Sequence, residues 1–192
     1  MFYKNINKLI DVLVIFAKNN QQLEKFRINK LLYFVDKFHL QKYGRDVMGD
    51  VYKKLPKGPI ADNTTNLLKA FENNLKYNFI NKDIEELIKY FVLKKIDNNY
   101  ELILKKSSGL SFLSSSEKEI IEDVLQKFGK KSTQELIDIT HKHKAWKLNK
   151  LSKIINKEMF LEGLTPEDTE YILGLMEVDK QARSFSKELV KC

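Results

Sequence analysis

The 192-residue chain contains a single cysteine, Cys192, which is its last residue. One cysteine cannot form an internal disulfide or supply a cysteine-based zinc site. The fold must therefore be held by an apolar core, and hydrophobic residues make up 43% of the chain, enough for such a core. A reducing compartment is typical of this cysteine usage, so we expect a cytoplasmic protein.

Long apolar runs are also missing. Eighteen consecutive apolar residues occur nowhere, which argues against a transmembrane helix. The first twenty residues begin like an export signal, with Lys4 and Lys8 before an apolar stretch. Asp11 interrupts that stretch, however, and no small-residue cleavage site follows. The sequence therefore predicts a soluble protein without a membrane partner.

The motifs of common catalytic and metal sites are absent as well. The glycines are scattered singly, so no phosphate-binding loop is present, and no serine lies in a Gly-x-Ser-x-Gly turn. His141 and His143 are two residues apart, which places them on different sides of a helix. We therefore predict no catalytic residues, no metal and no cofactor.

Arginine is scarce, with three residues among 34 basic ones, although the net charge is +8. Arginine is the usual reader of phosphates and guanine edges, so the charge alone is weak support for nucleic-acid binding. Its distribution is more informative, because residues 161–192 carry more acids than bases. Residues 141–157 carry no acid and six lysines, which are Lys142, Lys144, Lys147, Lys150, Lys153 and Lys157.

This lysine run can be interpreted in two ways. Together with Trp146, the only tryptophan, it could grip a phosphate backbone and stack a base. Alternatively, the last three lysines form the solvated back of a helix over 148–160. The inner face of that helix would contain Leu148, Leu151, Ile154 and Ile155.

Three amphipathic helices are predicted in the first 75 residues. Apolar residues recur every three or four positions over 4–18, over 25–43 and from about residue 59 or 60 to 75. Gly44 suits the C-terminal cap of the second helix. Between the second and third helices, residues 47–59 contain two glycines and two prolines, which favours a loop or a short extended segment.

A β-hairpin is predicted next. The segments 91–96 and 100–104 flank Asp97-Asn98-Asn99, and asparagine tolerates the positive φ that tight turns require. Residues 83–90, just before the hairpin, fit a helix or a strand. Because two strands alone are marginally stable, the hairpin must lie against helices.

Capping signals predict the later helices. Ser116 with Glu119 and Ser132 with Glu135 have the spacing of capping boxes. Thr165-Pro166 predicts the start of a last helix that runs to about residue 185. The sequence thus predicts a mainly α, single compact helical domain with a small β-hairpin over residues 1–160. An acidic C-terminal helical appendage follows over 161–192.

Five short segments, in their order along the chain, resemble the Panacea domain, which is the SocA-like antitoxin domain of bacterial toxin–antitoxin systems. The resemblance covers about residues 5–160. The segments are Lys30-Leu-Leu-Tyr33 followed by Tyr43-Gly44, Lys57-Gly-Pro-Ile60, Leu113-Ser-Ser-Ser-Glu117, Ser132-Thr-Gln-Glu-Leu136, and Thr140-His141 with Ala145-Trp146.

The resemblance implies a mostly helical fold with a small sheet. It also implies a cytoplasmic, non-enzymatic antitoxin that neutralises a cognate toxin protein, encoded in the adjacent gene, by direct binding. The signature residues, which we take as partner-binding candidates and expect mostly to shape the domain, are Tyr33, Tyr43, Lys57, Gly58, Pro59, His141 and Trp146.

The sequence allows two interpretations of Tyr33 and two of the Gly58-Pro59 corner. Tyr33 either widens the buried face of its helix or places its hydroxyl in an exposed groove. The Gly58-Pro59 corner either fixes the entry into a helix or forms an edge that contacts a partner. Nucleic-acid binding through the six lysines remains the alternative function.

Overall fold

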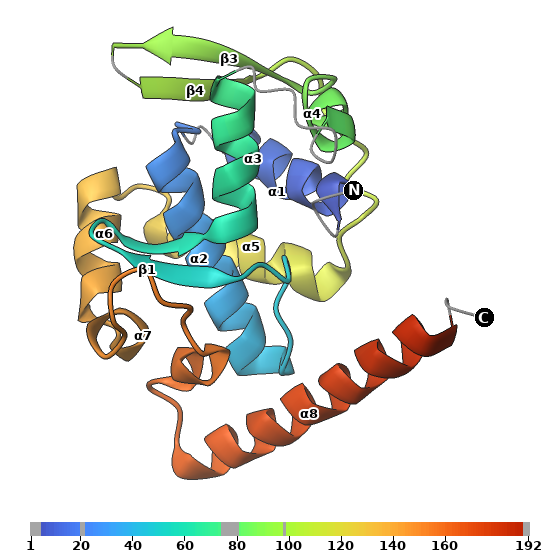
Figure 1. Ribbon diagram of the computed structural model, residues 1–192, viewed down its shortest axis with the longest axis vertical. Coiled ribbons are helices and arrows are strands. Elements are labelled where there is room, and N and C mark those ends of the chain that lie inside the picture. Colours follow the sequence, from blue (N-terminus) through green and yellow to red (C-terminus); the bar gives the residue numbers. More distant parts are fainter. Residues whose placement is uncertain (1–4, 20–21, 74–80, 98, 190–192) are drawn as a thin grey trace.

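Helix α2 (Lys25–Tyr43) lies at the centre of the fold, and Figure 1 shows the other elements arranged around it. The computed structural model describes residues 5–19, 22–73, 81–97 and 99–189. The bounds of α2 are those that the periodicity predicts, with Gly44 at a φ of 66° as its C-terminal cap. It contacts strand β2 (Gly58–Ala61) and helices α3 (Asp62–Glu72), α5 (Ser115–Phe128), α6 (Thr133–Lys142), η1 (Lys157–Leu161) and α8 (Pro166–Leu189). The fold is mainly helical, as predicted.

Because α2 is enclosed on almost every side, several of its polar side chains are buried, including those of Arg27, Asn29, Lys30, Asp36 and His39. A buried polar group costs free energy unless it finds a hydrogen-bond partner. Arg27 illustrates how that cost is met, since its guanidinium donates to the carbonyls of Gly129 and Lys131, both at 2.7 Å. The polar residues of α2 therefore tie neighbouring segments to the central helix.

Helix α1 (Ile6–Lys18) packs against α5 and against α4 (Asn81–Leu87). The capping box predicted at Ser116 and Glu119 is wrong by two residues, because Ser114 and Glu117 form it. Glu117 also accepts a 2.6 Å hydrogen bond from Nζ of Lys8 in α1, and this bond favours the start of α5 at Ser115. The box predicted at Ser132 and Glu135 is confirmed at the start of α6.

The predicted hairpin is confirmed. Strand β3 (Phe91–Ile96) pairs antiparallel with β4 (Asn99–Leu104), with Phe91 opposite Leu104. Asp97 has a φ of 52° in the turn, and Asn98 lies outside the described residues. The backbone N–H of Leu102 donates to the carbonyl of Leu23 at 3.1 Å, so the hairpin is attached to the segment that precedes α2.

A second hairpin occupies most of the segment predicted as a loop or short extended stretch. Strand β1 (Tyr52–Leu55) pairs with β2, with Tyr52 opposite Ala61. Helix α3 therefore starts at Asp62 and not at residue 59 or 60, because residues 58–61 are used in the strand. Asp50 caps α3 by accepting the backbone N–H groups of Asn63 and Thr64, both at 3.0 Å.

The helix predicted over residues 148–160 is wrong. The short helix α7 (Lys144–Lys147) ends just before this range, and an irregular segment leads from it to η1. This segment pairs its backbone with the outer edge of β1, through an isolated bridge between Ile154 and Lys53. This pairing gives hydrogen-bond partners to backbone N–H and C=O groups at the edge of β1. Residues 148–156 therefore bind to the strand and do not form a helix.

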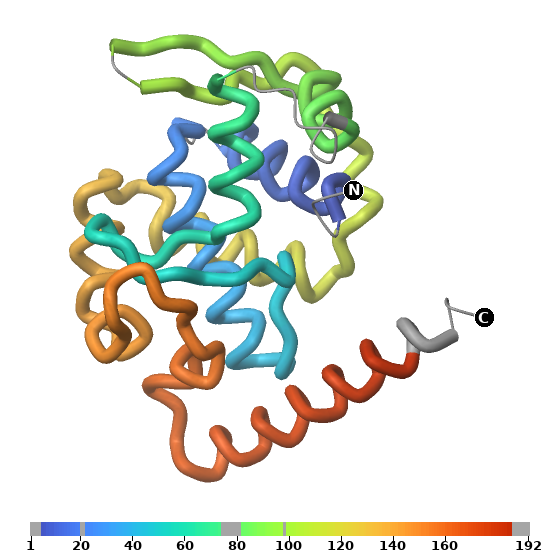
Figure 2. The backbone as a smooth tube through the Cα atoms, viewed as in Figure 1, coloured from blue at the N-terminus to red at the C-terminus, as the bar shows by residue number. Residues whose placement is uncertain are grey.

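Helix α8 begins where the sequence predicts, with Thr165 Oγ1 accepting the N–H of Asp168 at 3.1 Å, and it runs to Leu189, beyond the predicted end. Figure 2 shows it as a long red rod against one end of the fold. Ile172 of α8 is buried, while Tyr171, Val178 and Phe185, spaced seven residues apart on the same helix, are exposed.

Cys192 lies outside the described residues. In the parts of the chain that the structure describes, no helix has both the length and the apolar character needed to cross a membrane.

We predict that Gly44→Ala loosens α8 from the body. A Cβ at Gly44 would lie 2.4 Å from Cβ of Leu175 in α8, and the φ of 66° is itself unfavourable for alanine. Strain and overpacking together should lower the free energy of unfolding by about 2–4 kcal/mol. Urea unfolding and limited proteolysis of α8 measure the effect.

Gly49→Ala is the matched control, since Gly49 has the same φ of 66° and the new Cβ would lie 3.8 Å from Nη1 of Arg183, an ordinary contact distance. It should cost only the backbone strain, about 1–2 kcal/mol. Equal losses for the two variants would show that α8 does not press on Gly44.

Candidate partner-binding surface

Most signature residues converge on the β1–β2 hairpin. Lys57, Gly58 and Pro59 belong to it, and His141 and Trp146 pack against it from α6 and α7. Tyr33 reaches it from α2 through an edge-on ring contact with Tyr52, at a centroid distance of 5.8 Å.

The side chains of Tyr43 and Lys57 lie outside this cluster, although Lys57 is part of the hairpin turn. Tyr43 is at the far end of α2, where its hydroxyl donates to Glu119 at 3.1 Å. Lys57 is exposed at the hairpin turn, with its ammonium 4.3 Å from the ring centroid of Phe26. The structure thus brings together five of the seven candidates.

Gly58 is the point at which α2, the hairpin and α6 meet. Its φ is 96°, and a Cβ there would lie 2.6 Å from Oγ1 of Thr140 and 2.8 Å from Nζ of Lys30. The Lys30 ammonium donates to the carbonyl of Pro59 at 2.8 Å and is completely buried. Burial lowers the pKa of Lys30 to about 7. The Gly58-Pro59 corner is therefore packed inside the protein at these atoms.

Two further side chains of α2 fasten the ends of the hairpin. Asn29 Oδ1 accepts the backbone N–H of Ala61 at 2.8 Å, and Asp36 Oδ2 accepts the Tyr52 hydroxyl at 2.8 Å. Burial, together with the negative charge of Asp46, raises the pKa of Asp36 to about 7. Sequence reasoning missed both residues. The one available signal is their seven-residue spacing, which places them on the same face of α2.

The two interpretations of Tyr33 are decided in favour of burial. Its side chain is completely buried, and its hydroxyl lies 2.9 Å from Nδ1 of His143. Burial raises the pKa of Tyr33, while burial and the nearby Lys37 lower the pKa of His143 to about 4. Both groups are therefore neutral at pH 7, and they form a hydrogen bond between uncharged partners inside the protein.

Trp146 closes the hairpin from the other side. Its indole Nε1–H donates to the Leu55 carbonyl at 2.9 Å, and its ring stacks on His141 with centroids 3.8 Å apart. The ammonium of Lys54 lies 4.3 Å from the Trp146 ring centroid, which adds a cation–π contact. Within the described residues, His141 and His143 therefore face different neighbours and do not converge on one point.

The segment after α7 is held to β1 by its backbone. Lys54 donates its N–H to the Lys153 carbonyl at 3.1 Å and accepts the N–H of Ser152 at 2.8 Å. The N–H of Ile155 donates to the carbonyl of Tyr52 at 2.8 Å, and the side chain of Ile155 is buried. In contrast, Leu148, Leu151 and Ile154, predicted as the inner face of a helix, are exposed.

The six lysines of 141–157 do not share one helical face. Lys142 ends α6, Lys144 and Lys147 lie in α7, and Lys150 and Lys153 lie in the following segment; all five are exposed. Lys157 differs, because its ammonium forms an ion pair with the largely buried carboxylate of Asp46. The predicted spacing of Lys150, Lys153 and Lys157 along a helix is therefore wrong.

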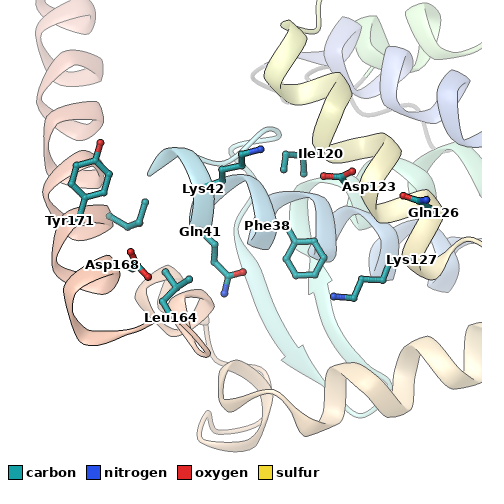
Figure 3. A pocket seen from close by; sticks show the side chains of 11 residues that line it. Phe38, Gln41, Lys42, Ile120, Asp123, Gln126, Lys127, Leu164, Asp168 and Tyr171 are labelled. Atoms are coloured by element: carbon teal, nitrogen blue, oxygen red, sulfur yellow. The ribbon is translucent and has the colours of Figure 1, made fainter.

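An open cleft of about 790 Å³ lies between α2, α5 and the start of α8. Figure 3 shows Phe38 and Gln41 of α2 facing it, with Tyr171 and Asp168 of α8 on the opposite wall. No sequence pattern predicted it, because its walls come from three helices that are distant along the chain.

We predict that Gly58→Ala lowers the free energy of unfolding by about 3–5 kcal/mol, from backbone strain plus overpacking against Lys30 and Thr140. Gly163→Ala is the control, because Gly163 has a φ of 97° but open space around its Cβ position. That variant should cost about 1–2 kcal/mol, from strain alone. Chemical denaturation measures the free energy of unfolding of both variants. If Gly58→Ala lowers it no more than Gly163→Ala does, the close packing at this corner is contradicted.

Lys30 also predicts a pH dependence. Its pKa is about 7 in the folded protein and 10.5 ordinarily, so between these values the unfolded chain binds more protons. The free energy of unfolding should therefore rise with pH, by up to about 2–3 kcal/mol from pH 7.5 to 9.5. Urea titrations at both pH values should show this rise in the wild type and its loss in Lys30→Met. The same rise in both proteins would contradict the assignment.

One of three comparisons with known proteins found a match. The family described as "Antitoxin SocA-like, Panacea domain" matches residues 28–147, a range that runs from α2 through α7 and contains every signature residue. Searches of curated proteins and of solved structures found no match. The match spans more than half of the chain, and the protein therefore belongs to the SocA-like antitoxin family with a Panacea domain.

Proposed function

We propose that this protein is an antitoxin of a bacterial toxin–antitoxin system, and that it neutralises a toxin encoded in the adjacent gene by direct protein–protein binding. Family membership over residues 28–147 is the observation that carries this proposal. In this proposal the protein acts in the cytoplasm and without catalysis, as a subunit that covers a functional surface of the toxin.

The exposed surface of the fold supports binding to a protein. Specific interfaces have apolar centres, and several parts of this chain expose large apolar side chains. Two of these parts are the segment after α7, with Leu148, Leu151 and Ile154, and helix α8, with Tyr171, Val178 and Phe185. We propose that residues 1–160 form the binding domain and that 161–192 are an acidic appendage, which contains α8.

Nucleic-acid binding is supported by one observation, which is the exposure of five lysines between residues 142 and 153. The three exposed aliphatic side chains in the same part of the chain favour a protein partner, because they offer nothing to a phosphate backbone. We therefore place the antitoxin first.

Co-expression with the neighbouring gene tests the proposal. Each protein is produced from its own inducible promoter, so that regulation of the native promoter cannot explain a rescue. We expect the neighbour alone to stop growth, co-expression to restore growth, and the two proteins to purify together at a fixed ratio.

A variant with a disrupted core, Ile121→Asp, is the control, since Ile121 is completely buried in α5. It should neither rescue growth nor co-purify with the neighbour. A harmless neighbour, or a rescue without a complex, would contradict neutralisation by direct binding.

A further inference from the structure

The segment between α7 and η1 exposes three large aliphatic side chains within seven residues. Leu148 is 69% exposed, Leu151 57% and Ile154 62%. Single exposed apolar side chains are ordinary on protein surfaces, whereas a group of them in one short segment indicates an interaction site. Figure 2 shows this part of the chain in orange, and it lies against the edge of strand β1 on its way from α7 to α8.

The backbone that carries these side chains is held in place. Besides the three backbone bonds to Tyr52 and Lys54, the Lys54 ammonium donates to the carbonyl of Asn149 at 2.8 Å. The Asn149 side chain donates to the carbonyl of Ala145 at 2.8 Å, and the buried Ile155 anchors the end of the segment. An ordered backbone means that little conformational entropy is lost when a partner binds.

Each exposed aliphatic residue directly follows a lysine, in the pairs Lys147-Leu148, Lys150-Leu151 and Lys153-Ile154. Two acids of this part of the fold are paired with other lysines, Asp62 with Lys53 and Asp46 with Lys157. Among the residues that the structure describes, none of Lys147, Lys150 and Lys153 forms an ion pair. The three exposed lysines thus place positive charge beside the aliphatic side chains.

We propose that these six residues, hereafter the 147–154 surface, are the docking site for the toxin, and that the toxin presents an apolar depression edged by carboxylates. This inference rests on the proposed antitoxin function and names its contact surface. The aliphatic side chains supply the buried centre of the interface, and the lysines supply charge complementarity and a faster encounter.

Three triple variants test the site, with the purified toxin as the probe. The first replaces the aliphatic residues (Leu148→Thr, Leu151→Thr, Ile154→Thr), and the second the lysines (Lys147→Gln, Lys150→Gln, Lys153→Gln). The third is the matched control on the β3–β4 hairpin (Val92→Thr, Ile96→Thr, Ile103→Thr), whose residues are 46%, 39% and 38% exposed. Thermal unfolding establishes that each variant is folded.

We expect the first variant to weaken toxin binding by about 100-fold or more and the second by about 10-fold, mostly through a slower, salt-dependent association. The control should stay within about threefold of the wild type. A first variant that binds as tightly as the wild type would overturn the 147–154 surface and leave the antitoxin function standing.

Two other outcomes overturn the inference for different reasons. If the wild type itself neither binds the toxin nor rescues growth, the proposed function fails together with the site. A 30-base-pair DNA duplex is the second probe. The surface is a nucleic-acid site if three results are found together. The wild type binds the duplex, only the lysine variant loses that binding, and both variants bind the toxin as tightly as the wild type does.

Discussion

A set of buried polar bonds from α2 fixes the position of the β1–β2 hairpin, and the rest of the structure depends on it. Lys30 binds the Pro59 carbonyl, Asn29 binds the N–H of Ala61, and Asp36 binds the Tyr52 hydroxyl, each at 2.8 Å. Removing one partner of such a bond leaves a buried polar group unsatisfied, which costs about 1–3 kcal/mol. These bonds favour one orientation of the hairpin over others that would bury similar apolar area.

The orientation of the hairpin determines what the chain exposes further on. With β2 against α2, the outer edge of β1 is free to bind the backbone of the segment after α7. That pairing turns Ile155 inward, while the neighbouring Ile154 is exposed. Five of the seven signature residues accordingly lie in the hairpin or pack against it, and the surface we assign to the partner lies beside them.

The sequence predicts most of the fold, and its failures have physical causes. Helices α1 and α2 and the β3–β4 hairpin follow from local periodicity and turn residues, which act over a few positions. The spacing of Leu148, Leu151 and Ile155 also fits a helix, but the free edge of β1 competes for the same backbone and cannot be seen locally. Three consecutive serines offer more than one capping box, and the distant Lys8 favours the one with Glu117. The seven-residue spacing of Asn29 and Asp36 places them on one face of the helix, but it does not predict which groups of the hairpin they bind.

The central claim is that the hairpin cluster holds the fold and the 147–154 surface binds the toxin. Methyl NMR during a titration with the toxin tests it most directly, with the methyl groups of Leu148, Leu151 and Ile154 as probes. The account predicts that these signals shift or broaden at sub-stoichiometric toxin, while those of Val92 and Ile103 on the β3–β4 hairpin stay in place. Changes confined to Val178 and Leu173 of α8, with the three loop residues unaffected, would contradict it.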